Sequence, residues 1–266
     1  MNNEQLKKPL VYRVWFKLVL IALVMLPAMS EIHYDPQDTS LVIFQVLSSP
    51  YITQFEWLMP ITKLILGLVI FSQFFLKEAG SKVLLAYYGI ILLIIGIGQN
   101  LAMTQEYGWV LITGNLLIEY AVIAFVFFDL FKGLTKYMKH DLDPKRLWVL
   151  IPMLLAFVEP YVIKNEQIVF GLNNILTNDT GVTYCMITPL VIGILLIFIK
   201  GVHLPTLHII SFVGLYFGIV NMLTWFVFNP INWWMGVLHL PLLILSIYGL
   251  IGSSWEKHKT RLETNS

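Results

Sequence analysis

Eight long apolar runs divide this chain, and each is close to the length that an α-helix needs to cross a bilayer. A helix of about 20 residues spans a hydrocarbon core of ~30 Å, since each residue adds 1.5 Å of rise. The runs lack the alternation of polar and apolar residues that is typical of outer-membrane strands. The sequence therefore predicts an all-α, polytopic integral membrane helix bundle that forms one membrane domain over residues 1–266. The predicted spans are 14–29, 57–76, 82–103, 109–131, 147–163, 182–199, 207–228 and 233–252.

The composition agrees with a membrane setting. Apolar residues make up 58% of the chain and charged residues only 12%, whereas about 25% of a soluble domain is charged. The bilayer is therefore the expected partner and the cell membrane the expected location. No basic stripe lies outside the loops between apolar runs, so no nucleic-acid partner is expected. Cys185 is the only cysteine, which excludes an intrachain disulfide.

The basic residues predict the orientation of the chain. If the N-terminus is cytoplasmic, 15 of the 17 Lys and Arg residues fall on the cytoplasmic side, and only Lys63 and Lys164 do not. Cytoplasmic loops of membrane proteins carry such an excess of basic residues. We therefore expect both termini in the cytoplasm. The cytoplasmic set is Lys7, Lys8, Arg13, Lys17, Lys77, Lys82, Lys132, Lys136, Lys139, Lys145, Arg146, Lys200, Lys257, Lys259 and Arg261.

Two segments leave alternatives open. The basic start, the apolar run 18–26 and the small residues after it also match a cleavable signal peptide, which would leave seven spans. The apolar stretch 40–47 is too short to cross the membrane. It is expected to lie on the membrane surface or to dip into the bundle.

No motif in the chain identifies a reaction. A nucleophile elbow, a zinc-binding pattern and a Walker A loop are all absent from the sequence. Neither a metal nor another cofactor is therefore expected. His203 and His208 flank Pro205 and are interpreted as solvated loop residues rather than as metal ligands. No internal repeat indicates a transporter.

Two local patterns have structural interpretations. Gly214 and Gly218, with Ser211 one turn earlier, share a helix face on which a neighbouring helix can approach closely. Asn178-Asp179-Thr180 matches a glycosylation sequon in an outer loop, which matters only in a eukaryotic host.

The most informative feature is a layer of polar residues in the outer half of the predicted membrane. Lys63 lies six residues inside the second span, about 9 Å deep at 1.5 Å per residue. Glu119 lies deeper, near the midplane, one turn from Asn115. Buried charges cost a few kcal/mol each in the membrane and are usually functional. We therefore expect an outward-facing polar cavity. Its candidate residues are Glu119, Lys63, Asn115, Glu159, Asn221, His239 and Gln99.

All of these residues except Glu119 also have a purely structural interpretation. Lys63 can extend outward to the interface, and Glu159 can be interfacial if its span ends before Pro160. Asn115, Asn221 and Gln99 can hold helices together by hydrogen bonds, at ~0.6 kcal/mol each. Glu119 lies too deep to reach the surface easily.

The leading hypothesis is a membrane protein that binds or moves a polar or amphiphilic substrate reached from the extracytoplasmic side. Glu119 would be the central charge, with Lys63 or His239 as its partner. One alternative is an integral membrane enzyme that acts on a lipid or lipid-linked substrate, with Glu119, Glu159 or His239 as general acid or base. A second alternative is a non-catalytic accessory subunit. No catalytic residue is assigned, and the sequence does not indicate an oligomeric state.

Overall fold

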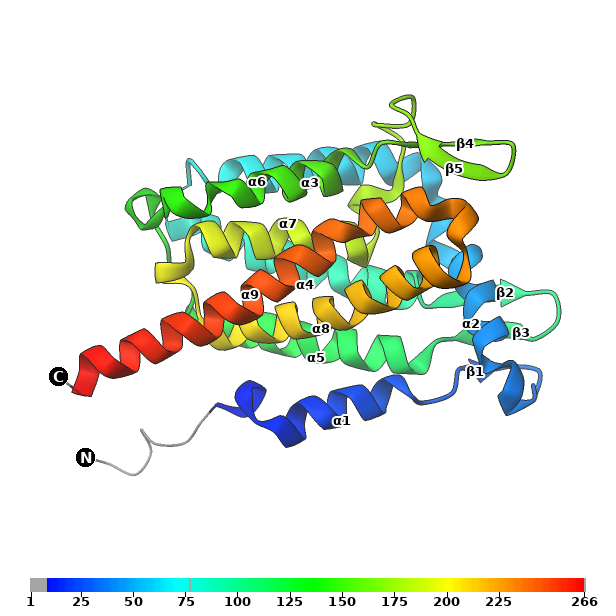
Figure 1. Ribbon diagram of the computed structural model, residues 1–266, viewed down its shortest axis with the longest axis horizontal. Helices are drawn as coiled ribbons and strands as arrows, with labels where there is room; N and C mark the ends of the chain where they lie inside the picture. The colour runs from blue at the N-terminus through cyan, green and yellow to red at the C-terminus, as the bar shows by residue number, and fades with distance from the viewer. Residues whose placement is uncertain (1–8, 77, 266) are drawn as a thin grey trace.

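The computed structural model describes residues 9–76 and 78–265 and is 73% helical. Lys7, Lys8 and Lys77, which entered the charge argument, lie outside these residues. Most of the helices run along one common axis (Figure 1). They are α1 (Val14–Val24), α2 (Thr39–Ser48), α3 (Met59–Ser72), α4 (Glu78–Gly98), α5 (Thr113–Lys132), α6 (Leu150–Val158), α7 (Tyr184–Ile197), α8 (Leu204–Leu223) and α9 (Trp233–Asn265).

By length and composition, five helical stretches of the described chain can cross a membrane. These are Pro36–Ser72, Glu78–Gly98, Thr113–Lys132, Leu204–Phe228 and Pro230–Lys259. The first contains a kink at Phe55, in the 3-10 helix between α2 and α3. The three other axial helices, α1, α6 and α7, are 11, 9 and 14 residues long. Each of the predicted spans overlaps one of the helices α1 and α3–α9.

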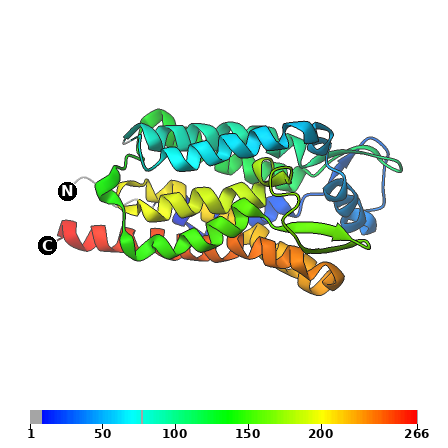
Figure 2. The ribbon, with the colours of Figure 1, turned by 90° about the horizontal axis from the view of Figure 1, so that it is seen from above.

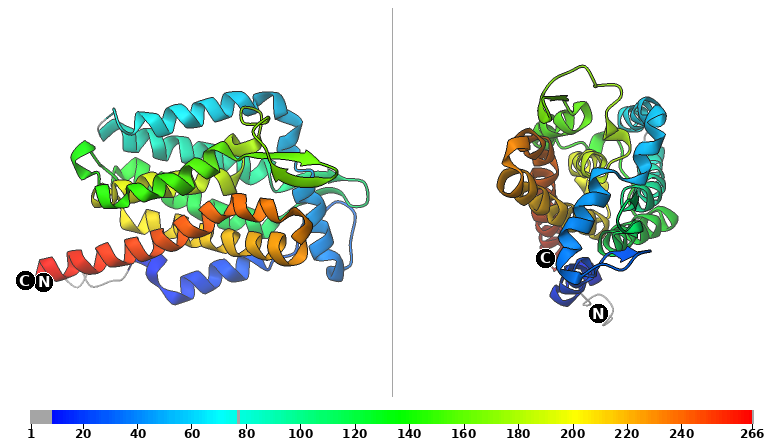
Figure 3. Two further views of the ribbon diagram at one scale, coloured as in Figure 1. Left: turned by 45° about the horizontal axis from the view of Figure 1, so that its top comes forward. Right: turned by 90° about the vertical axis from the view of Figure 1, so that its right-hand side faces the viewer.

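The short helix α7 forms the centre of the bundle. Each of its 14 residues is buried, and the end-on view shows it surrounded by the other helices (Figure 3). The outer helices instead expose apolar side chains, among them Leu64, Ile94, Phe131 and Ile151. A soluble protein avoids large apolar surfaces of this kind, whereas lipid covers them at no cost.

The ends of four predicted spans are strands rather than helix, and this corrects the sequence-based boundaries. The strands are β1 (Met29–Ser30), β2 (Leu101–Thr104), β3 (Gly108–Leu111), β4 (Tyr161–Lys164) and β5 (Gln167–Phe170). β3 pairs antiparallel with both β1 and β2, and β4 pairs with β5. Asn165 and Glu166 both have positive φ in the two-residue turn between β4 and β5, which is the geometry that joins such strands tightly. Hydropathy alone does not separate these apolar strands from the helices that they extend.

Helix α2 lies at the same end of the bundle as the hairpins (Figures 1 and 2). Val42 and Val46 are buried there in a small core with Ala102 and Val110. Leu41 and Phe44 on the same helix are exposed. The amphipathic pattern fits a helix that packs on the hairpins with one face and meets the membrane surface with the other.

The small residues of α8 pack against α9 within the same chain. A Cβ atom at Gly214 would lie 2.4 Å from Ser246 Oγ, and one at Gly218 would lie 3.0 Å from Leu243 Cα. Both contacts are closer than ordinary side chains allow, so glycine is required for this helix pair. The small-residue pattern therefore serves an intrachain contact.

Candidate functional site

Lys63 of α3 is buried and does not extend outward. Only 4% of its surface is exposed, and its ammonium donates to Asn178 Oδ1 at 2.7 Å and to the carbonyl oxygen of Ile175. The carbonyl oxygen of Val158 lies 3.4 Å away, and the Phe157 ring 5.4 Å from the ammonium. A buried ammonium needs such a set of acceptors, because it gives up water on all sides.

Glu159 faces the same cluster. Helix α6 ends at Val158, and Glu159 follows with a φ of 46°, directly before Pro160. Its side chain is 2% exposed and interacts electrostatically with Lys63. The Thr180 hydroxyl donates to Glu159 Oε2 at 2.8 Å and lies 2.9 Å from Asn178 Oδ1. The early end of the helix therefore turns this carboxylate inward rather than toward the interface.

The loop that completes this cluster is buried inside the bundle. Its 3-10 turn, Asp179–Gly181, packs directly on the backbone of α3. A Cβ atom at Gly181 would lie 2.6 Å from Lys63 N and 2.7 Å from the carbonyl carbon of Thr62. Irregular backbone occurs inside membranes only where protein or a water-filled cavity satisfies its polar groups. Here the side chain of Asn178 satisfies one of these backbone groups, because it donates a hydrogen bond to Val158 O at 2.8 Å.

Glu119 of α5 lies in a second polar group. It is 2% exposed, and its Oε2 atom accepts a hydrogen bond from Asn100 Nδ2 at 2.9 Å. Gly96 of α4 makes room for the carboxyl group, since a Cβ atom there would lie 3.3 Å from Glu119 Oε2. No Lys, Arg or His in the described part of the chain forms an ion pair with it. A buried carboxyl group without such a pair needs a proton or a cation as its partner.

The start of α7 joins these groups. Gln99 Oε1 accepts from the Tyr184 backbone N–H at 3.1 Å, and Tyr88 OH lies 3.0 Å from Thr188 Oγ1. Glu119 interacts electrostatically with Tyr184 and Cys185. We refer to residues 178–188 as the central segment, because it contacts both the Lys63 cluster and the Glu119 group.

Asn221 and His239 both contact Trp225, and Asn221 also contacts the central segment. Asn221 Nδ2 lies 3.5 Å from Cys185 Sγ, and Asn221 Oδ1 accepts from Trp225 Nε1 at 3.2 Å. His239 stacks obliquely near Trp225, with ring centroids 6.4 Å apart, and its Nδ1 lies 2.7 Å from Met235 O. Within the described residues, no hydrogen bond or ion pair joins its ring to a carboxylate.

The structure thus brings six of the seven candidate residues to one segment, but in separate contacts. Lys63 and Glu159 meet Asn178 and Thr180, while Gln99, Glu119 and Asn221 meet the first turn of α7. His239 contacts Trp225 and interacts electrostatically with Asp179. Asn115 is partly buried, and its side chain makes no hydrogen bond within the described residues. The expected pairing of Glu119 with Lys63 or His239 is not observed.

The sequence argument missed Asn100, Asn178 and Thr180. Asn100 adjoins Gln99, so its predicted depth in the third span could have identified it. The other two lie in a segment that hydropathy assigns to an outer loop. Asn178 was interpreted only as part of a sequon. Its side chain is 3% exposed and its amide is fully engaged with Lys63, Val158 and Glu159. The folded protein therefore does not present Asn178 as a glycosylation acceptor.

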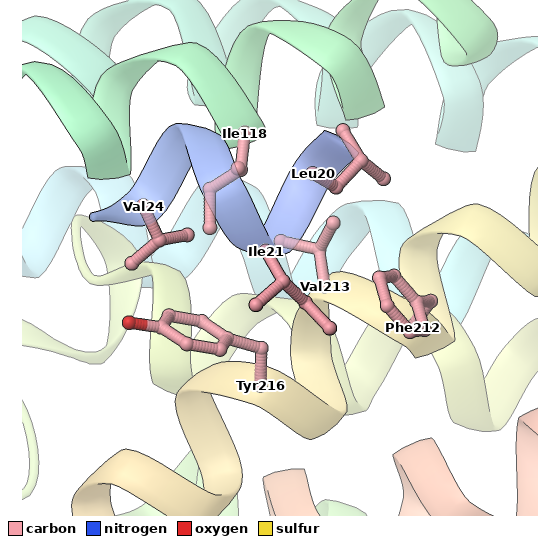
Figure 4. A pocket seen from close by; sticks show the side chains of 7 residues that line it. All are labelled: Leu20, Ile21, Val24, Ile118, Phe212, Val213 and Tyr216. Atoms are coloured by element: carbon pink, nitrogen blue, oxygen red, sulfur yellow. The ribbon is translucent and has the colours of Figure 1, made fainter. Parts of the chain in front are cut away.

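A small apolar pocket lies between α1, α5 and α8, away from these polar groups (Figure 4). Its volume is about 10 Å³, roughly that of one water molecule, and aliphatic side chains such as Leu20, Ile118 and Val213 line it. A gap of this size and polarity is a packing defect rather than a binding site.

Comparisons with protein-family models, with curated proteins and with solved structures find no match for this chain. The geometry of the central segment is therefore the basis for a functional proposal.

Proposed function

We propose that α1 and α3–α9 all cross the membrane, with both termini in the cytoplasm. The start of α1 and the end of α9 lie at one end of the bundle, opposite the hairpins (Figure 1). The end near the chain termini carries most of the loop lysines and arginines, as cytoplasmic ends do. The shorter helices gain length from flanking 3-10 turns, Pro144–Val149 before α6 and Ile199–Gly201 after α7.

This topology predicts which loop positions a membrane-impermeant maleimide labels in intact cells. With Cys185 changed to serine, Glu106→Cys and Lys164→Cys should be labelled without permeabilisation, because both side chains are exposed at the hairpin end. His140→Cys, exposed at the opposite end, should be labelled only after permeabilisation. Labelling of His140→Cys in intact cells would contradict the orientation.

We further propose that the protein binds and moves a polar or amphiphilic substrate that enters from the extracytoplasmic side. The observation that carries this proposal is the buried, irregular backbone of residues 178–183, which leads from the hairpin end to Glu119. Transporters commonly build their sites from interrupted helices with irregular backbone inside the membrane, and the buried segment before α7 has such irregular backbone. The unpaired carboxyl group of Glu119 favours a substrate with a cationic group, or one that moves together with a cation or proton.

The enzyme alternative has less support. General acid–base chemistry needs a base within hydrogen-bond reach of its partner group. His239 bonds to the Met235 carbonyl and not to Glu119 or Glu159. The accessory-subunit alternative predicts that the polar groups only hold helices together.

Cys185 provides a test, because it is the only cysteine and interacts electrostatically with Glu119. In proteoliposomes of known orientation, we expect a small cationic methanethiosulfonate added outside to modify Cys185 about tenfold faster than an anionic one. An effect of this size corresponds to roughly 1.4 kcal/mol of attraction by the Glu119 charge. Glu119→Gln should remove the preference, and Cys185→Ser is the background control.

The proposal predicts a water-filled route from outside to Cys185. It would be contradicted if neither reagent modified Cys185 in the folded protein while both labelled it fully after denaturation. That result, with near-normal function of Glu119→Gln in cells, would instead favour the accessory subunit.

A further inference from the structure

A wide groove lies at the end of the bundle opposite the hairpins. Its volume is about 630 Å³, within the range of small-ligand sites. Three helices form it, with Lys17 from α1, His208 from α8 and the remaining residues from α9. The lining residues are Lys17, His208, Leu250, Ile251, Ser254, Trp255 and His258.

The α9 side of the groove changes in polarity along its length. Its residues recur at positions 250, 251, 254, 255 and 258, a spacing that places them on one helix face. Leu250 and Ile251 come first, then Ser254 and Trp255, and His258 lies nearest the end of the chain. Ile251 and Trp255 are 58% and 68% exposed, so the groove opens toward the surroundings of the bundle. An apolar inner half and a basic outer end match the two parts of a phospholipid.

The opposite wall adds positive charge. The Lys17 ammonium lies 5.4 Å from the centre of the Phe212 ring, which places it between α1 and α8. His208 Nδ1 lies 2.9 Å from Ser253 Oγ, and its ring contacts Tyr12 at 4.3 Å between centroids. The Lys257 ammonium lies 3.6 Å from the centre of that Tyr12 ring. Among the described lining residues none is acidic, so the groove favours an anion.

We propose that this groove binds an anionic phospholipid of the leaflet around this end of the bundle. The acyl chains would lie against Leu250 and Ile251, and the headgroup phosphate would lie near Lys17 and His258. Trp255 stands at the depth where tryptophan prefers the membrane interface. Basic pockets between membrane helices on the cytoplasmic side bind anionic headgroups by this chemistry. The proposal does not depend on substrate transport, which involves the other end of the bundle.

Lipid retention tests this proposal. The full-length protein is purified in detergent with equal amounts of phosphatidylglycerol and phosphatidylcholine of the same acyl chains, and bound lipid is counted by native mass spectrometry. We expect preferential retention of phosphatidylglycerol. Lys17→Gln should lower that retention about fivefold and leave phosphatidylcholine unchanged, as expected for one lysine near a lipid phosphate. Lys139→Gln, at the same end but outside the groove, is the matched control.

Ser254→Trp provides an independent variant, because it fills the groove without changing its charge. It should abolish the preference even if Lys17→Gln proves too unstable to purify. The proposal is overturned if both lipids are retained equally, if Ser254→Trp retains phosphatidylglycerol normally, or if millimolar inorganic phosphate displaces the lipid completely. The last result would show a site for a free anion instead.

Discussion

Replacing Lys63 by methionine is expected to lower the free energy of unfolding by about 3–5 kcal/mol. The substitution keeps most of the side-chain volume but removes the only ammonium in the cluster with Glu159 and Asn178. Glu159 would lose its electrostatic interaction with Lys63, and the carbonyl oxygen of Ile175 and Asn178 Oδ1 would lose their donor. Removal of one partner of a buried charged network leaves the other uncompensated, which is why the cost exceeds that of one ordinary hydrogen bond.

Equilibrium unfolding of purified protein in mixed micelles measures this effect. Lys164→Met is the matched control, because Lys164 is an exposed lysine at the same end of the bundle. The double variant Lys63→Met with Glu159→Gln should recover part of the loss, since it removes both charges. Equal stability of Lys63→Met and Lys164→Met would show that Lys63 does not stabilise the buried loop.

Replacing Gly181 by valine is expected to destabilise the protein by about 3 kcal/mol, at the upper end of the cost of overpacking. The new Cβ atom would meet backbone atoms of Thr62 and Lys63 at 2.6–2.7 Å, and backbone cannot move aside as a side chain can. The loop Asp179–Gly181 would therefore lift from α3, and Asn178 would separate from Lys63. Modification of Cys185 by thiol reagents should become faster, because the same loop leads directly into α7.

Gly67→Ala is the control that tests whether any side chain added to a glycine of α3 destabilises the protein. A Cβ atom at Gly67 would lie 3.3 Å from the Phe157 ring, a side chain that can shift by a few tenths of an ångström. We expect a change within ~1 kcal/mol there. If Gly181→Val unfolds at the same denaturant concentration as Gly67→Ala, the close packing of the loop on α3 contributes little.

Composition and apolar periodicity were sufficient to predict a helical membrane bundle, because a chain with 58% apolar residues must place them in lipid or in a core. They also gave an expected membrane depth for each polar residue, since that depth follows from the rise per residue along each helix. Glu119, Lys63 and Glu159 were found in this way, and all three are buried.

Hydropathy did not predict where helices stop. The strands β2, β3 and β4 consist mostly of apolar residues, like the helices beside them, and hydrogen-bond pairing between strands distinguishes them. For the same reason the sequence left two positions open for the end of α6, at residue 163 or before Pro160.

Only the tertiary structure determined which deep polar residues meet. Depth along a helix says nothing about which neighbour its polar face turns to, so Lys63 and Glu119 were expected together. They lie in different groups, joined by a loop that hydropathy assigns to the outside. Asn178 and Thr180 are buried in the bundle, where the Lys63 ammonium and the Glu159 carboxylate bond to them. That compensation depends on contacts between residues more than 100 positions apart, such as Lys63 with Asn178, and no local pattern in the sequence records them.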